Sequence, residues 1–295
     1  MKRIVYTIAI GKPKFAECAL GLGRSLKLIG DTTRRVIVTD QPDYPWLSCF
    51  DEVLTPQDPF EWTLMSKLNA LDRTDADQVL FIDCDSLVFK RLAPIFDTCS
   101  GRGLCVQGRM ASSGTWYGEV ADHLAKHGVD AMPQFNGGLI YYERTARCQS
   151  LIESCWAEGR KSKESGFLYD SPLIPEEPYV SLAMARDGFR EGACYLVPDE
   201  MDYTSTATGL IGKLVLDVMR NRCSFVCRRF NVRHVEPYVF HAARYINFAV
   251  YWKQLDRLAW LDRYEAEHEF GYMSPWQKFE RSVNRRYLKY IRRVF

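Results

Sequence analysis

The first hundred residues of this 295-residue chain alternate between short buried segments and amphipathic ones, and this alternation restricts the fold more than any other feature. Four apolar segments have the composition of strands: residues 3–10, 34–40, 51–56 and 78–85. Residues 14–30 and 62–74, which lie between them, are predicted to be helical. Because parallel strands need helical, right-handed crossovers, the pattern predicts an α/β fold with a mostly parallel central sheet flanked by helices.

The rhythm changes after residue 85, where glycine and serine become frequent. Further strands are expected at 103–108, 135–142 and 238–243, and further helices at 144–159, 179–188 and 245–264, with a long loop at 160–178. We therefore expect one domain over residues 1–274, followed by a C-terminal helical extension at 275–295.

Composition excludes several classes of protein. The chain is 47% hydrophobic, so it can form a sizeable core, yet it has no run of the roughly 20 apolar residues that a membrane span needs, and no signal peptide is expected. Its ten cysteines are scattered singly, which favours reduced structural thiols in a cytoplasmic protein. The net charge of +2 predicts no nucleic-acid partner.

Residues 275–295 concentrate positive charge, with seven lysines and arginines against Glu280. Apolar side chains recur there near helical spacing, so the segment is predicted to form a basic amphipathic helix. Such a helix suits an anionic membrane surface, which would make the protein peripheral at the membrane. The alternative is a terminal helix that docks on the domain and exposes a basic face.

Two carboxylates, Asp83 and Asp85, follow the apolar segment 79–82 directly. In an extended strand alternate side chains share a face, so both would point the same way while Cys84 points back into the protein. Ligands gather at the carboxyl ends of parallel strands, and two desolvated carboxylates there need a cation between them. Oxygen ligands suit Mg²⁺ or Mn²⁺. The alternative is that Asp83 caps a turn and Asp85 is solvated.

At these residues the sequence resembles GT-A fold glycosyltransferases of family 8, which includes glycogenin and bacterial lipopolysaccharide glycosyltransferases. Six segments match family motifs in the family's order: ALGLGRSL (19–26), TTRRVIVTD (32–40), SKLNAL (66–71), LFIDCDSLVF (80–89), FNGGLIYY (135–142) and PEEPYVSLA (175–183). The resemblance implies a hexosyltransferase that moves a sugar from a nucleotide sugar, usually UDP-linked, to a glycan or glycolipid acceptor with retention of configuration.

The resemblance also implies a metal site. Asp83 and Asp85 would hold Mn²⁺ (or Mg²⁺), and the late histidine of the family matches His241. An imidazole ligand favours Mn²⁺ over Mg²⁺. A structural, hydrogen-bonded histidine at a strand end is the alternative reading of His241.

Other site residues follow from the same motifs. Asn136 would bind the donor sugar, and Gly137 and Gly138 would let the backbone approach it, although the two glycines could equally form a β-bulge. Lys67 would lie near the donor, or else face solvent. Glu176 and Glu177 match the acidic position and the glutamine position beside the reacting centre, or else begin a helix.

The donor nucleotide is expected at the ends of the first two strands and at the acidic pair. The matching positions are Thr7, Ile8, Ala9, Ile10, Thr39, Asp40 and Cys84. An aspartate that ends a strand, as Asp40 does, is also a common turn former.

The sequence departs from the family pattern in two places. After His241 the family often has a glycine and then a lysine that grips the diphosphate, whereas this chain has Arg244 and Asn247. Arg244 is the expected substitute, because a guanidinium suits phosphate oxygens. The first loop reads KPKF (12–15), which leaves the base open. A nucleotidyltransferase that makes nucleotide sugars, or a binding protein that has lost catalysis, are the alternative functions.

Overall fold

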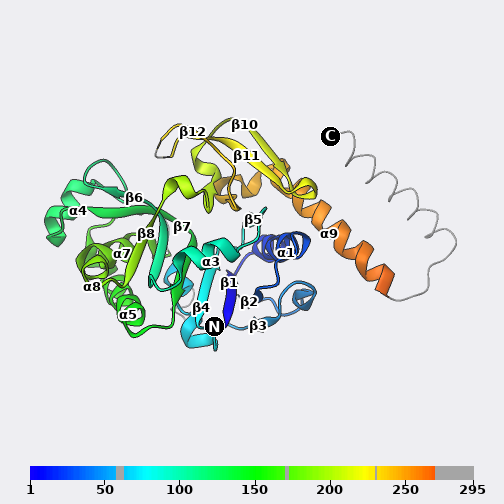
Figure 1. Ribbon diagram of the computed structural model, residues 1–295, viewed down its shortest axis with the longest axis horizontal. Coiled ribbons are helices and arrows are strands. Elements are labelled where there is room, and N and C mark those ends of the chain that lie inside the picture. The colour runs from blue at the N-terminus through cyan, green and yellow to red at the C-terminus, as the bar shows by residue number, and fades with distance from the viewer. Residues whose placement is uncertain (58–62, 170–172, 230, 270–295) are drawn as a thin grey trace.

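The computed structural model describes residues 1–57, 63–169, 173–229 and 231–269. Its centre is a seven-stranded sheet with the order β3-β2-β1-β4-β7-β6-β8 (Figure 1). The strands are β1 (Arg3–Ala9), β2 (Arg34–Thr39), β3 (Glu52–Leu54), β4 (Gln78–Ile82), β6 (Leu104–Ala111), β7 (Met132–Glu143) and β8 (Cys194–Pro198).

Most strand pairs of this sheet are parallel. Strand β1 lies parallel to β2 and β4, β2 to β3, and β6 to β8, while β7 runs antiparallel to both of its neighbours, β4 and β6. The prediction of a mostly parallel α/β sheet is therefore confirmed.

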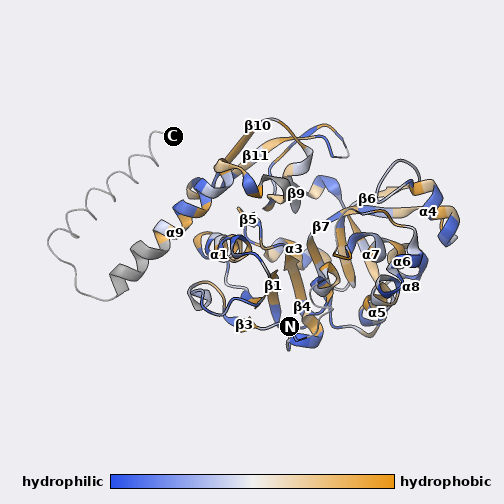
Figure 2. Cartoon of the chain, turned by 180° about the vertical axis from the view of Figure 1, so that it is seen from behind, coloured by the Kyte–Doolittle hydropathy of each residue, from blue (hydrophilic) through white to orange (hydrophobic). Residues whose placement is uncertain are grey.

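Helices cover both faces of the sheet. On one face, α1 (Pro13–Leu28) and α3 (Ala93–Cys99) contribute Leu22, Leu26 and Phe96 to a core shared with the strands. On the other face lie α2 (Ala70–Arg73), α5 (Ala146–Arg160) and α7 (Glu177–Ala183). Figure 2 shows the apolar strands between these layers. Each fully buried large apolar side chain contributes about 1.5–3 kcal/mol to folding.

Two small sheets lie beside the main one. In the first, β13 (Val239–His241) is flanked by β5 (Ser86–Val88) and β9 (Thr204–Thr206). This pairing sets His241 opposite Ser86, one residue after Asp85. The second sheet consists of β10 (Leu210–Asp217), β11 (Arg222–Cys227) and β12 (Arg233–Val235).

Helix α9 (Ala249–Glu269) packs on α1 and on the second small sheet. Tyr251, Leu255 and Leu258 form its buried side. A Cβ atom at Gly21 of α1 would lie 2.2 Å from Leu255 Cδ2, so glycine allows the two helices to approach this closely. None of the described helices is both long and apolar enough to cross a membrane. The predicted basic helix at 275–295 lies outside the described residues.

Several elements differ from the sequence prediction. Residues 64–73 form a 3₁₀ turn (Leu64–Leu68) followed by α2, and not one helix from 62 to 74. Within the expected loop 160–178 lies the short α6 (Ser162–Ser165), and α7 begins at Glu177 and continues into a π-helical turn, Met184–Gly188. Helices α3, α4 (Val120–His127) and α8 (Phe189–Glu191), and strands β5 and β8 to β12, were not expected from the sequence.

Candidate functional site

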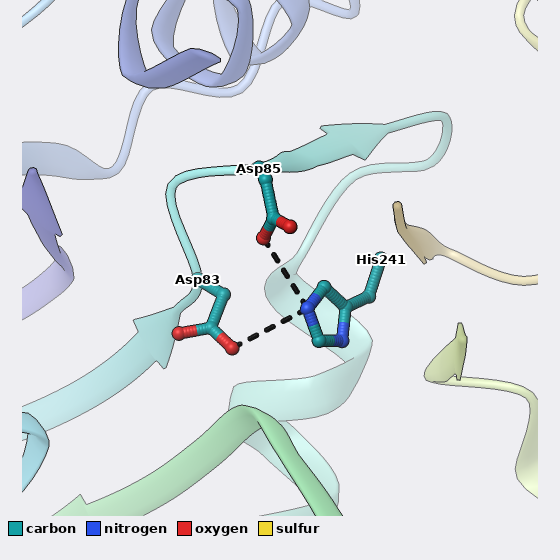
Figure 3. A group of neighbouring side chains, drawn as sticks. All are labelled: Asp83, Asp85 and His241. Carbon is teal, nitrogen blue, oxygen red and sulfur yellow. Dashed lines mark ion pairs between the residues drawn. The ribbon is translucent and has the colours of Figure 1, made fainter. Parts of the chain in front are cut away.

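Asp83, Asp85 and His241 come together at the carboxyl end of β4. His241 Nε2 lies 3.4 Å from Asp83 Oδ2 and 3.2 Å from Asp85 Oδ1. One ligand atom from each of the three residues fits within 4.8 Å of the others, and both carboxylates point at the imidazole ring (Figure 3). The residues that sequence reasoning grouped as a metal site are therefore neighbours in space.

The local geometry of the carboxylate pair differs from the predicted one. Strand β4 ends at Ile82, and Asp83-Cys84-Asp85 form a turn in which Ser86 N donates to Asp83 O at 3.0 Å. The period-two alternation of a strand is therefore the wrong explanation. The turn brings both carboxylates toward His241, while Cys84 packs partly against the apolar cluster under α1.

The charges of Asp83, Asp85 and His241 stabilise one another. Burial alone would raise the pKa of Asp85, but the His241 ring outweighs it and holds the pKa of that carboxyl below its usual range. Burial alone would lower the pKa of His241, but the carboxylates of Asp85 and Asp83 raise it above its usual value. Each charge thus depends on the others for its stability in a buried place.

Lys67 and Glu176 form a buried ion pair next to the carboxylates. Lys67 Nζ lies 2.9 Å from Asp83 Oδ1 and 2.8 Å from Glu176 Oε1, and it donates to Gly137 O at 3.1 Å. The side chain of Lys67 is 7% exposed and that of Glu176 is 2% exposed. The prediction that Lys67 lies near the donor site stays open, but its solvent-facing alternative is wrong.

The pKa values of this pair reflect its burial. Burial alone would lower the pKa of Lys67, but Asp83 and Glu176 together raise it above its usual range. The pKa of Glu176 is raised to about 7, first because of burial and also because of Glu177 and Asp83. The single Lys67 ammonium is shared between two carboxylates, so it does not fully offset the burial of Glu176.

Strand β7 carries a wide bulge at the site. Val106 pairs with Ile140 and Gly108 pairs with Phe135, so residues 136–139 of β7 stand opposite Gln107 alone. The bulge forms part of the site, because the bulged backbone directs Asn136, Gly137 and Gly138 toward His241 and Glu176. The two readings of this motif, a bulge and a functional segment, are therefore compatible.

Both glycines of the bulge are required by close contacts. A Cβ atom on Gly137 would lie 1.7 Å from Glu176 Oε1, and one on Gly138 would lie 2.5 Å from His241 Nδ1. Asn136 Oδ1 lies 2.7 Å from His241 Nδ1, and Glu177 Oε1 accepts from Gly137 N at 2.6 Å. The bulge thus joins the cluster of Asp83, Asp85 and His241 to the acids that begin α7.

A pocket of about 460 Å³ opens beside the cluster. Asp83, Cys84, Asp85, His241 and Lys67 line it, together with Ile8, Ile10, Gly11, Lys12, Phe15, Thr63, Leu64, Ser66, Phe81 and Leu173. The pocket lining therefore combines the carboxylates and the imidazole with apolar side chains from β1, α1 and β4.

The residues of β1 that were predicted to bind the nucleotide point alternately to opposite faces of the strand. Ile8 and Ile10 line the pocket, whereas Thr7 is fully buried and Ala9 belongs to the apolar cluster beneath α1. Asp40 accepts hydrogen bonds from Gly11 N at 3.1 Å, and Thr39 Oγ1 accepts one from Gln41 N at 3.2 Å. Asp40 thus fixes the loop between β1 and α1. The predicted diphosphate ligand Arg244 has a side chain outside the described part of the structure.

Sequence reasoning missed several residues of the site. Lys12 and Phe15 of the KPKF segment line the pocket, and no ion-pair partner of Lys12 is found in the described part of the chain. Lys14 Nζ lies 3.5 Å from Asn247 Oδ1. The departure of this loop from the family pattern was a usable signal for these residues. Tyr117, which donates to Glu177 Oε2 at 2.9 Å, has no such signal.

The three residues fit a divalent cation. Two carboxylates and one imidazole form an oxygen and nitrogen donor set, and the set suits Mn²⁺ better than Mg²⁺ because of the imidazole. Asn136 contacts the other ring nitrogen of His241, as outer partners of metal-bound histidines do. Lys67 Nζ contacts both oxygens of Asp83, at 2.9 Å from Oδ1 and 3.2 Å from Oδ2, and so offsets the charge of this carboxylate beside the cluster.

Comparison with known protein structures identifies the fold. No protein-family model and no curated protein sequence matches this chain. The galactosyltransferase LgtC, solved in complex with donor and acceptor sugar analogs, superposes with a TM-score of 0.53 and 15% identity over 88% of this chain and 95% of that chain. An active-site mutant of LgtC gives a TM-score of 0.55 and 13% identity over 87% and 95% of the two chains.

A weaker likeness is found to the glycosyltransferase GlyE of Streptococcus pneumoniae TIGR4, with a TM-score of 0.47 and 14% identity over 69% of this chain and 47% of that chain. The superposition on LgtC extends over nearly all of that enzyme, and it agrees with the mostly parallel sheet described above. This chain therefore has the GT-A fold that its sequence motifs predicted.

Proposed function

We propose that this protein is a metal-dependent glycosyltransferase that moves a sugar from a nucleotide sugar to a glycan or glycolipid acceptor. The observation that carries the proposal is the convergence of Asp83, Asp85 and His241 on the wall of a pocket at the carboxyl end of β4. The GT-A fold, shared with the galactosyltransferase LgtC, supports it. The donor is proposed to be UDP-linked.

In this proposal Asp83, Asp85 and His241 hold Mn²⁺, which would neutralise the diphosphate of the donor and stabilise charge on the leaving group. Lys67 holds Asp83 in place through contacts with both carboxylate oxygens. Asn136, Gly137 and Gly138 form the edge next to which the sugar would lie. Because the leaving group is a nucleoside diphosphate, no acid is needed to protonate it, and the paired acids of glycosidases are not required.

The surroundings of the two glutamates bear on how configuration would be retained. Glu176 is nearly inaccessible and paired with Lys67. Glu177 accepts from Gly137 N, Asn136 Nδ2 and Tyr117 OH. Both carboxylates are already committed to protein donors, which weakens each of them as a nucleophile. We therefore favour substitution on the same face of the sugar over a double displacement through a covalent intermediate.

The direct test is turnover of donor alone. The full chain is incubated with Mn²⁺ and a panel of nucleotide sugars, and the slow release of free nucleoside diphosphate is measured with and without a chelator. Asp85→Ala is expected to abolish metal-dependent donor binding. Asp97→Ala, which removes an exposed carboxylate paired with Arg3, is the matched control and is expected to behave as the wild type.

The other outcomes of the same assay separate the alternatives. Release of pyrophosphate would indicate a nucleotidyltransferase. Donor binding without any turnover would indicate a binding protein that has lost catalysis. Metal-independent binding that survives Asp85→Ala would show that the assigned site is wrong.

The segment 275–295 leads us to propose a membrane-associated acceptor, because its charge and apolar spacing suit an anionic surface. Sedimentation with anionic vesicles tests this step by itself. Removal of residues 275–295 is expected to abolish co-sedimentation and to leave donor hydrolysis intact. Unchanged co-sedimentation would contradict the proposal and would point to a different surface of the protein.

A further inference from the structure

Tyr117 has a backbone conformation that a bulky residue rarely adopts. Its φ angle is 54°, in the left-handed region that normally favours glycine. It lies at the tip of a tight turn between Gly114 and α4, closed by a bridge between Thr115 and Glu119 and by a hydrogen bond from Val120 N to Gly114 O. The turn thus presents a tyrosine where a glycine would be the unstrained choice.

The neighbouring chain holds Tyr117 in this conformation. Its carbonyl oxygen accepts from Leu168 N at 2.7 Å and lies 2.9 Å from His123 Nε2. Its ring packs at 5.1 Å from the ring of Trp116. Strained backbone at one position persists where the surroundings determine it, and such positions cluster at functional sites.

The hydroxyl of Tyr117 begins a hydrogen-bond chain that ends at the proposed metal site. Tyr117 OH donates to Glu177 Oε2 at 2.9 Å, and Glu177 Oε1 accepts from Asn136 Nδ2 at 3.3 Å. Asn136 Oδ1 lies 2.7 Å from His241 Nδ1. The other ring nitrogen of His241 faces Asp83 and Asp85.

The direction of each bond in this chain is fixed by its partners. Gly138 N can only donate, and it donates to Asn136 Oδ1 at 3.2 Å, so the oxygen of the amide faces His241. The Nδ2 group of Asn136 then faces the carboxylate of Glu177, which accepts. His241 Nδ1 must therefore carry a proton, so Nε2, which faces the two aspartates, is the atom that would bind a metal after losing its own proton.

We infer that Tyr117 is a positioning residue for the metal site, acting through Glu177 and Asn136 to hold His241 in the ring orientation and tautomer that bind a divalent cation. The inference rests on the metal site of the proposed function. It assigns Tyr117 no contact with the metal. Mutation of an outer partner of a metal-bound histidine typically weakens metal affinity 10- to 100-fold. Tyr117 lies two hydrogen bonds beyond Asn136, so its mutation is expected to weaken metal affinity about three- to tenfold.

The test measures Mn²⁺ binding to the full chain without any sugar, from the loss of the free-ion signal in electron paramagnetic resonance. Tyr117→Phe removes the hydroxyl and keeps the ring, and it is expected to weaken Mn²⁺ binding about three- to tenfold. Tyr141→Phe is the matched control, because Tyr141 OH also donates to a glutamate, Glu143, at 2.9 Å, away from the site. The control is expected to bind Mn²⁺ as the wild type does.

A second comparison separates positioning from a general structural role. If Tyr117 acts through Asn136, adding Tyr117→Phe to Asn136→Ala should cause no further loss of Mn²⁺ affinity. Equal affinity of wild type and Tyr117→Phe, or a loss that adds fully to that of Asn136→Ala, would overturn the inference. Failure of the wild type itself to bind Mn²⁺ would instead contradict the proposed function.

Discussion

Lys67 is the residue on which the site's electrostatics depend most. Its ammonium is buried among the carboxylates of Asp83 and Glu176, with the ring of Phe81 5.1 Å away. Removing one partner of a buried ion pair leaves an uncompensated charge. We expect Lys67→Met to lower the free energy of unfolding by about 3–5 kcal/mol, measured by urea denaturation.

The reason for this expected loss can be checked separately. Glu176→Gln added to Lys67→Met is expected to recover part of the stability, because the amide needs no counter-charge. Lys213→Met changes an exposed lysine and is expected to have little effect. A Lys67→Met variant as stable as the wild type would show that the pair does not stabilise the fold.

Two lysines, Lys12 and Lys67, line the pocket. Among the described residues, Lys67 pairs with carboxylates and Lys12 does not. A diphosphate bound near Asp83 and Asp85 needs positive charge besides the metal, and Lys67 is already shared between two acids. We expect Lys12→Ala to weaken binding of UDP about tenfold, or about 1.4 kcal/mol, while Mn²⁺ binding stays unchanged. Calorimetry with UDP and with Mn²⁺ measures both, and an unchanged UDP affinity would exclude this role.

At the scale of residues, the sequence predicted which side chains meet but not how they meet. Asp83, Asp85 and His241 were predicted as a group from their motifs, and the structure brings them together. The alternation argument failed because Ser86 N bonds to Asp83 O and closes a turn, an interaction that no residue pattern reports. Tyr117 was not predicted, since its role depends on a left-handed turn and on contacts made across the fold.

At the scale of elements, the bulge of β7 is the feature that builds the site. A Cβ atom at position 138 would lie 2.5 Å from His241 Nδ1 and 2.8 Å from Asn136 Oδ1, so both groups would have to move. We expect Gly138→Ala to weaken Mn²⁺ binding at least about tenfold, because it displaces His241 from its outer partner. Overpacking of this kind also costs about 1–3 kcal/mol of stability.

A second glycine provides the control for this experiment. In α5, a Cβ atom at Gly159 would meet the flexible end of Met65 at 3.2 Å, and alanine is favoured over glycine within a helix by about 0.5–1 kcal/mol. Gly159→Ala should therefore fold and bind Mn²⁺ like the wild type. Equal Mn²⁺ affinity of the Gly138→Ala variant would contradict the close contact that the structure assigns to the bulge.

Elements with strong periodicity were predicted well, and elements defined by tertiary contacts were not. Strands β1, β2 and β4 and helix α1 appear where their apolar patterns place them. The expected helix at 62–74 is instead a 3₁₀ turn and a short helix, and within this turn Lys67 reaches inward to Asp83 and Glu176. The β10–β12 sheet was missed because Gly212 and Lys213 interrupt the apolar residues of β10, and because β12 is only three residues long.

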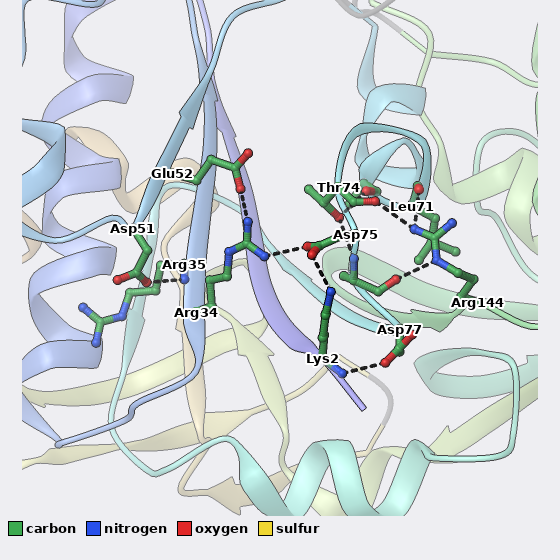
Figure 4. A network of polar contacts seen from close by, with 12 residues as sticks. Lys2, Arg34, Arg35, Asp51, Glu52, Leu71, Thr74, Asp75, Asp77 and Arg144 are labelled. Carbon is green, nitrogen blue, oxygen red and sulfur yellow. Dashed lines mark hydrogen bonds and ion pairs between the residues drawn. The ribbon is translucent and has the colours of Figure 1, made fainter.

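At the scale of the whole molecule, a polar network joins the amino ends of the strands (Figure 4), whereas the pocket lies at the carboxyl end of β4. Asp75 pairs with Lys2 and with Arg34, each at 2.7 Å, and Arg34 also pairs with Glu52. Arg144 donates to the carbonyls of Ala76, Leu71 and Thr74. The network ties β1, β2, β3 and the turn before β4 to the end of β7.

This network predicts a specific dependence of stability on pH. The hydrogen bonds from Lys2 and Arg34 lower the pKa of Asp75 to about 2, below the value of about 3.9 in an unfolded chain. Its stabilisation is therefore present above about pH 4 and is lost as the pH falls toward 2. We expect the Tm of Asp75→Asn to lie below that of the wild type at pH 7 and to converge with it below pH 3. A gap in Tm that is the same at both pH values would contradict this assignment.

The fold of the whole molecule could be predicted because six short motifs in the right order constrain a chain far more than any one of them, and the superposition on LgtC confirms it. The positions of the small sheets and of α9 could not, since they depend on packing such as that of Leu255 over Gly21. The small sheet of β5, β13 and β9 affects the site directly, because β13 carries His241.

The proposed function requires that Asp83, Asp85 and His241 bind the cation that holds the donor. A crystal of the full chain soaked with MnCl₂ and UDP, measured near the manganese absorption edge, locates the metal by its anomalous scattering. We expect a peak within coordination distance of one oxygen of Asp83, one oxygen of Asp85 and Nε2 of His241, with the diphosphate of UDP on its open side. Bound UDP with no anomalous peak there, or with manganese held by other residues, would contradict it.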